Sequence, residues 1–228
     1  MDYEVLFDFM KEKMDYAKFV DLRPYLELSD YYRTDTHWKQ ECITDVAEVL
    51  KDGMNYNEEK NATKEEIEER AEATLNRYKL EELEEPFMGV YYGQAALPIK
   101  PDTLRYLNNE TLQKCKVTSY DTGKAKEAVL YNMEKAEGMD PYEMFLSGTS
   151  ALQVIENPQI TQEKELLVFR DSFGSSLIPL LVEEYSKITV IDIRYVQSNM
   201  LGNFIDCQGQ DTLFLYSTVV LNNSMSLR

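Results

Sequence analysis

The chain has 228 residues, and its 24 basic and 41 acidic side chains give a formal net charge of -17 at pH 7. Because nucleic-acid binding depends on Lys and Arg neutralising phosphates, this charge excludes nucleic acid as a partner and disfavours anionic membrane surfaces. The length is sufficient for a sizeable core, and we expect one domain over residues 1–228.

The sequence lacks the usual signals of membrane, disulfide-rich and metal proteins. No apolar run approaches the roughly 20 residues of a membrane-spanning helix, and the N-terminus is acidic where a signal peptide is basic. We therefore expect no direct membrane insertion and no export signal in this chain. Cys42, Cys115 and Cys207 are widely spaced, which argues against a disulfide framework and a zinc site. With no nucleotide-binding motif either, we expect no metal and no cofactor.

The N-terminal third is predicted to be mainly helical. Apolar residues at helical spacing predict helices over 3–14 and 38–51, and a short apolar stretch at 17–22 predicts a strand. A capping box at Thr63 predicts the start of a third, acidic helix that runs to Pro86. Its dense glutamates are expected to form a solvated face and not a metal site.

The middle of the chain changes in character. Aromatic and β-branched residues lie among Gly, Pro and Asn, which is typical of short strands and turns. We expect a small β-rich insertion at about residues 86–122, followed by a helical segment over 124–136.

The C-terminal third alternates apolar runs with amphipathic segments. Strands are expected at 166–170, 187–193 and 212–219, and helices at 175–186 and 195–204. This alternation is typical of βαβ units with parallel strands. The sequence therefore predicts an α/β fold, a three-layer sandwich with a mainly parallel sheet.

A serine follows the first of these strands. Asp171 and Ser172 occupy the turn between the strand and the next helix. Ligands of open α/β sheets bind at the carboxyl ends of strands, and backbone N–H groups of such a turn can face a developing oxyanion. Ser172 is therefore a candidate nucleophile. A helix cap formed by Ser172 or Ser175 is the commoner use of serine at such a turn.

The only histidine, His37, lies two residues after Asp35. A serine nucleophile requires a base, and imidazole is suited to that task near neutral pH. A carboxylate two residues away can orient the ring and stabilise its charged form. Any histidine-dependent acyl transfer by this chain must use His37. The alternative is a surface loop in which Asp35 pairs with Arg33 and His37 caps the next helix.

Two segments carry a family resemblance. YYRTDTHW and LLVFRDSFGSSLIPLL resemble the two signature blocks of the DHHW family, and DPYEMFLSG, VIDIRY and TLFLYSTVVLNNS extend the similarity. Members of that family are SGNH-hydrolase-like and similar to the domains that acetylate alginate and other bacterial polysaccharides. The resemblance implies an SGNH- or flavodoxin-like fold.

The resemblance also implies a Ser-His-Asp triad. Ser172 matches the nucleophile, His37 the general base and Asp35 its orienting partner. The sequence departs from the family at Thr36, where the family name has a histidine. Asp35 and His37 keep the triad positions, so this departure leaves the implied chemistry intact.

Further residues are candidates for binding the substrate or the oxyanion. The Ser172 N–H is a natural donor, and Gly148 offers close backbone approach to a ligand. Asn222 and Asn223 could supply side-chain donors after the last strand, and Arg33 could steady an anionic or sugar substrate. The alternative for Gly148 and for the two asparagines is an ordinary role in a turn. The alternative for Arg33 is a salt bridge to a nearby acidic residue.

Two functions therefore follow from the resemblance and the motifs. The first is a serine esterase or O-acetyltransferase that acts on an acetylated cell-envelope or extracellular glycan. The second is a catalytically inactive surface or carbohydrate-binding protein with the same fold. A purely structural partner-binding domain is a third possibility. The resemblance implies an extracytoplasmic or cell-surface location in bacteria.

Overall fold

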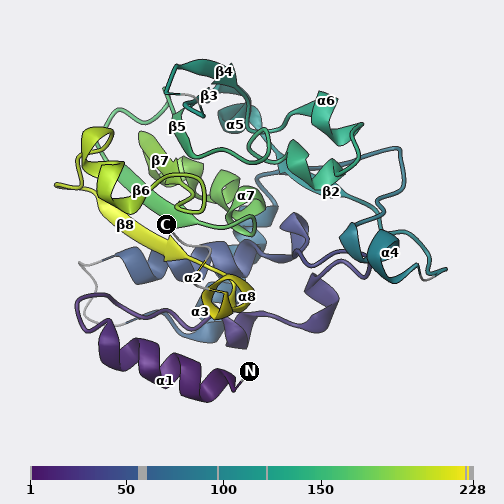
Figure 1. Cartoon of the computed structure of the whole chain (residues 1–228), viewed down its shortest axis with the longest axis horizontal. Helices are drawn as coiled ribbons and strands as arrows, with labels where there is room; N and C mark the ends of the chain where they lie inside the picture. Colours follow the sequence, from purple (N-terminus) through teal and green to yellow (C-terminus); the bar gives the residue numbers. More distant parts are fainter. Residues whose placement is uncertain (1, 56–60, 97, 122, 224, 226–228) are drawn as a thin grey trace.

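The computed structural model describes residues 2–55, 61–96, 98–121, 123–223 and 225 (Figure 1). Its strands are β1 (Lys79–Glu82), β2 (Arg105–Asn108), β3 (Lys116–Ser119), β4 (Lys126–Ala128), β5 (Leu152–Glu156), β6 (Glu165–Arg170), β7 (Lys187–Ile191) and β8 (Asp211–Leu215). Six of them form one sheet in the order β4-β3-β5-β7-β6-β8, and β1 and β2 form a separate two-stranded sheet.

Short helices connect the strands. The α-helices are α1 (Tyr3–Lys13), α2 (Thr44–Met54), α3 (Lys64–Leu75), α4 (Val90–Ala95), α5 (Glu110–Lys114), α6 (Met133–Ala136), α7 (Gly174–Leu177) and α8 (Thr218–Asn222). The 3-10 helices are η1 (Arg23–Tyr25), η2 (Leu28–Asp30), η3 (Gln40–Cys42), η4 (Pro141–Met144), η5 (Ile178–Glu184) and η6 (Ser198–Asn203). None of the described helices has the length and apolarity needed to cross a bilayer.

The α/β class is confirmed, but the main sheet is mixed, so the prediction of a mainly parallel sheet was wrong. β6 pairs in parallel with β7 and β8. In contrast, β5 pairs antiparallel with β7, and β3 pairs antiparallel with β5 and β4. Parallel neighbours require a crossover connection, which the chain supplies after β6 and after β7. β3 and β4 follow each other directly in the chain and therefore form a hairpin.

The strand β6 explains how the two faces of the sheet are covered. Leu166 and Val168 point into the larger core cluster, which also contains buried residues of α2 and η5. Leu167 and Phe169 alternate with them and point to the opposite face, where Leu201 of η6 packs. A strand with consecutive apolar residues, such as those at 166–169, is buried on both faces. In Figure 1, α2 and α3 lie between the sheet and the peripheral α1.

The N-terminal predictions had mixed outcomes. The helices expected over 3–14 and 38–51 are present as α1 and α2, with η3 preceding α2. The strand expected at 17–22 was wrong, because no described strand covers that segment. Val20 and Leu22 instead pack against the core from a segment without regular secondary structure.

The third helix is shorter than predicted. Thr63 forms the expected capping box, in which its side chain accepts from the N–H of Glu66 at 3.3 Å. The helix ends at Leu75, however, and β1 follows where we expected helix as far as Pro86. Glutamate favours helices, but pairing of β1 with β2 overrides this local preference.

The remaining segments also differ in detail. The segment 124–136 contains β4 and α6, and η6 occupies the helix expected over 195–204. The helix expected over 175–186 divides into α7 and η5. The last strand ends at Leu215, because the side chain of Ser217 caps α8.

The expected insertion at residues 86–122 contributes to both sheets. β2 pairs with β1 outside the main sheet, whereas β3 belongs to the main sheet. An isolated β-bridge joins Phe87 to Asp102, ahead of β2. Phe87 packs in a second buried cluster with Tyr32 and Tyr142. Leu97 and Thr122 lie outside the described residues.

Gln40 joins three parts of this fold, and replacing it should destabilise the protein. Its buried amide donates to the carbonyl of Ser176 at 2.7 Å and accepts from the N–H of Leu107 at 2.7 Å. Gln40→Ala leaves both groups unsatisfied, which should lower the free energy of unfolding by about 2–4 kcal/mol. Thermal unfolding should show a Tm roughly 10 °C lower. The exposed Gln113→Ala is the matched control, and equal Tm values for both variants would contradict this role.

Candidate active site

Ser172 lies in the turn between β6 and α7, at the carboxyl end of a parallel strand. Asp171, which is fully buried, holds this turn: one carboxylate oxygen accepts from the N–H of Phe173 at 3.0 Å, and the other accepts from the N–H of Ser217 at 2.7 Å. Phe173 is the N-cap of α7 and makes no side-chain cap bond. Neither Ser172 nor Ser175 therefore caps this helix, and the Ser172 hydroxyl is available for another role.

His37 lies in a loop whose backbone turns back on itself. A bridge between Tyr31 and Trp38 closes the loop, and the N–H of Tyr32 donates to the carbonyl of His37 at 3.1 Å. The N–H of His37 donates to Oδ1 of Asp35 at 3.0 Å. The Asp-Thr-His spacing thus allows one carboxylate to bind both the backbone and the ring of the same histidine.

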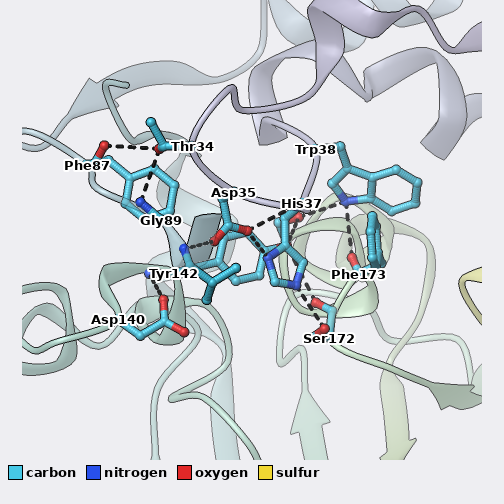
Figure 2. A network of polar contacts seen from close by, with 12 residues as sticks. Thr34, Asp35, His37, Trp38, Phe87, Gly89, Asp140, Tyr142, Ser172 and Phe173 are labelled. Carbon is cyan, nitrogen blue, oxygen red and sulfur yellow. Dashed lines mark hydrogen bonds and ion pairs between the residues drawn. The ribbon is translucent and has the colours of Figure 1, made fainter. Parts of the chain in front are cut away.

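The three predicted catalytic side chains meet (Figure 2). Nδ1 of His37 lies 2.5 Å from Oδ1 of Asp35, and Nε2 of His37 lies 2.8 Å from Oγ of Ser172. Ser172 and His37 are 135 positions apart in the chain. Such an arrangement allows His37 to remove the Ser172 proton while Asp35 holds the other ring nitrogen.

The charge of Asp35 is maintained by its hydrogen bonds. Burial raises the pKa of this carboxyl, but hydrogen bonds from His37 and from the backbone of Val90 lower it by more than burial raises it. The pKa of Asp35 is therefore below its ordinary value. Asp35 therefore stays ionised at neutral pH and favours the folded state there. This contribution to stability is lost as the pH falls through the lowered pKa.

A second group of residues holds Asp35 in place, and sequence reasoning missed it. The N–H of Val90 donates to Oδ2 of Asp35 at 3.0 Å. Thr34 Oγ1 accepts from the N–H of Gly89 at 3.1 Å and donates to the carboxylate of Asp102 at 2.7 Å. The segment at Gly89 and Val90 and the residue Asp102 are thereby bonded to the Asp35 loop. The close approach requires glycine, and Gly89 was the available signal in the sequence.

The other predicted site residues lie in different settings. Gly148 has a φ of +81° and faces the Lys135–Glu143 ion pair. Arg33 pairs with Asp102 at 3.2 Å, which is the salt-bridge alternative to substrate binding.

The two asparagines lie at the end of α8. Asn222 is its last residue and Asn223 is its C-cap, and both are exposed. Roles of Gly148, Asn222, Asn223 and Arg33 in binding substrate stay predictions. Among the described residues, no group of three or more His, Cys, Asp and Glu side chains is arranged to hold a metal ion.

The packing of Gly89 against Asp35 makes a direct prediction. A Cβ on Gly89 would lie 2.3 Å from Cβ of Asp35 and 2.6 Å from the carbonyl oxygen of Thr34. Gly89→Ala should therefore displace Asp35 and disturb its bond to His37. Because His37 is the only histidine, its imidazole signals in a spectrum of ¹⁵N-histidine-labelled protein report this change.

The matched control is Gly93→Ala in the neighbouring α4, where an added Cβ would meet nothing within 4 Å. We expect shifted or broadened imidazole signals in Gly89→Ala and unchanged signals in Gly93→Ala. Identical spectra for both variants would show that Gly89 does not hold the carboxylate.

Comparison with known proteins assigns the chain to a family. Comparison with curated proteins gave no match. A DHHW family protein from Eubacterium siraeum DSM 15702 has a similar structure, with a TM-score of 0.56 and 22% identity over 84% of this chain and 60% of that one. Bacillus cereus PatB1 with a sulfonyl adduct has a TM-score of 0.59 and 18% identity over 84% of this chain and 62% of its own.

A second PatB1 structure gives a TM-score of 0.56 and 19% identity over 84% of this chain and 63% of that one. The chain thus spans less than two thirds of the length of each of these structures. At such identities the likeness shows a shared fold. The family described as DHHW protein matches residues 22–191, which is more than half of the sequence. The chain therefore belongs to the DHHW family.

Proposed function

We propose that this chain is a serine esterase or O-acetyltransferase in which Ser172 is the nucleophile. The observation that carries the proposal is the contact of Ser172 with His37, together with the contact of His37 with Asp35. A nucleophile, a base and an orienting carboxylate within hydrogen-bond reach are the parts that acyl transfer by serine requires. Thr36, the departure from the family name, is partly buried and leaves both contacts in place.

The reaction proceeds in two steps. His37 Nε2 takes the proton of Ser172 Oγ as this oxygen bonds to the carbonyl carbon of an acetyl ester. The alcohol leaves with the proton from His37, and an acetyl-Ser172 intermediate remains. Water or a sugar hydroxyl then loses a proton to His37 and attacks the acetyl group, and His37 returns this proton to Oγ as the bond to Ser172 breaks. Asp35 stabilises the imidazolium, and the Ser172 N–H is the candidate oxyanion donor.

The substrate is proposed from the family and from charge. The resemblance to polysaccharide-acetylating domains favours an acetylated glycan of the cell envelope or extracellular space, and hence an extracytoplasmic or cell-surface location. The net charge of -17 favours a neutral glycan over a polyanionic one. A catalytically inactive glycan-binding protein is the alternative, and the experiments below distinguish the two.

Hydrolysis of p-nitrophenyl acetate tests the triad. Ser172→Ala and His37→Gln should reduce turnover to the uncatalysed background, because each removes a reacting group. Asp35→Asn should reduce kcat by about 10⁴-fold, as neutralising the carboxylate does in a comparable triad. Ser29→Ala, an exposed serine outside the site, is the matched control and should retain full activity. Full activity in folded Ser172→Ala would rule out Ser172 as the nucleophile.

Sulfonyl labelling separates a transferase from an inactive protein. PatB1, one of the similar structures, carries a sulfonyl adduct, and sulfonyl fluorides react with activated serine hydroxyls. Incubation with phenylmethanesulfonyl fluoride should place one adduct on Ser172, located by peptide mass spectrometry, and His37→Gln should prevent it. Labelling without ester hydrolysis would indicate a transferase that lacks its acceptor. A wild-type protein with neither labelling nor hydrolysis would support the inactive alternative.

A further inference from the structure

We propose that Tyr142 is the positioning residue for His37, because its ring stacks on the imidazole while its hydroxyl is bonded to the helix that follows Ser172. The two ring centroids are 3.8 Å apart and the planes differ by 10°. The Tyr142 hydroxyl lies 2.8 Å from Oγ of Ser176 in α7. This inference rests on the proposed function and adds a residue that the triad itself does not contain.

The need for such a residue follows from the hydrogen bonds of the imidazole. The ring nitrogens of His37 bond to Asp35 at one end and to Ser172 at the other. Bonds at opposite ends lie in the plane of the ring and resist sliding, but they resist tilting of the ring only weakly. The bond to Ser172 is also broken when the serine attacks the ester. A parallel aromatic ring against the imidazole face opposes tilting at every stage.

Tyr142 is itself rigidly held. It is buried, with 4% of its surface exposed, and its N–H donates to the side chain of Asp140 at 3.1 Å. Its ring packs on Phe145 with centroids 5.1 Å apart. Ser176, which bonds its hydroxyl, also accepts from the indole N–H of Trp38 at 3.0 Å. The stacking ring is thus fixed by its backbone, by its neighbours and by its hydroxyl.

The same side chain connects the base to the nucleophile. Ser176 belongs to α7, which begins two residues after Ser172. A displacement of α7 relative to the His37 loop would therefore strain the bond between Tyr142 and Ser176. In Figure 2, the Tyr142 ring lies against the imidazole, on the segment that also carries Asp140. Stacking additionally places an electron-rich face next to the imidazolium that forms when His37 takes the proton, which is a favourable arrangement.

Three variants test this role. Tyr142→Leu removes the ring and should lower kcat for p-nitrophenyl acetate by about 10- to 100-fold, as small displacements of catalytic groups do. KM should change less than about twofold, because the positioning role requires no contact between this ring and the substrate. Tyr142→Phe retains the stack and should keep kcat within about threefold of wild type. Ile67→Ala is the matched control, because Ile67 is also buried but lies in α3, outside the cluster that contains Tyr142. It should lower Tm but leave kcat unchanged.

Spectra of the single histidine give a readout that does not depend on activity. The Tyr142 ring should shift the ring-proton signals of His37 upfield. That shift should persist in Tyr142→Phe and Ile67→Ala, and in Tyr142→Leu it should fall to what the tilted Phe173 ring, 5.0 Å from the imidazole, contributes. If Tyr142→Leu does not fold, an absence of the upfield shift in wild type and in Tyr142→Phe would overturn the inference.

The outcomes separate this inference from the proposed function. A folded Tyr142→Leu variant with wild-type kcat, or with the same loss of kcat as Ile67→Ala, would overturn the positioning role while the esterase proposal stands. A wild-type protein without hydrolysis or sulfonyl labelling would overturn the proposed function. The upfield shift and its loss in Tyr142→Leu would then still establish that Tyr142 holds the imidazole.

Discussion

The hydrogen bond between His37 and Ser172 is the interaction on which the site depends. It joins a loop near the start of the chain to a turn 135 positions later. Each partner is placed by an independent part of the fold. β6, which is paired on both sides with β7 and β8 and buried on both faces, fixes the turn. The loop contains no helix or strand, and besides the backbone bridge that closes it, it depends on side-chain contacts for its shape.

Those contacts come from segments outside the two signature blocks. The loop that follows β1 supplies Val90 and Asp102. The N–H of Val90 donates to the carboxylate of Asp35, and the carboxylate of Asp102 accepts from the N–H of the adjacent Thr34. The segment around η4 supplies the ring that covers His37. The region between the two signature blocks therefore supplies the residues that hold Asp35 and His37 in place. A substitution there can disturb the triad without touching any of its three members.

The sequence was most informative where local pattern and tertiary structure agree. The apolar run that begins at Leu166 predicted a strand over 166–170, and the turn after it predicted where Ser172 lies. The pairing of Ser172 with Asp35 and His37 came from the family resemblance, since spacing along the chain says nothing about contact across it. Local acidic composition predicted helix at Lys79–Glu82, where pairing with β2 produces a strand. The antiparallel half of the sheet was missed for the same reason, because strand pairing depends on partners distant in sequence.

The supporting residues were missed for a different physical reason. Gly89, Thr34 and Tyr142 are common residue types, and each acquires its role only from what it contacts in the folded chain. Arg33 shows the converse, since its charge identified it as a candidate ligand or ion-pair partner, and only the folded chain shows that its partner is Asp102. Charge and spacing in the sequence therefore identify the side chains that can react. The residues that hold those side chains in place are identified only by their contacts in the folded chain.

Trapping the covalent intermediate would test the central claim most directly. The protein would be mixed with an activated acetyl ester, quenched with acid within the first turnovers, digested and analysed by mass spectrometry. The account predicts one acetyl group on the peptide that contains Ser172, formed rapidly and then lost to water or to an added sugar. Ester turnover with no acetyl group on Ser172, or with the group on another side chain, would contradict it.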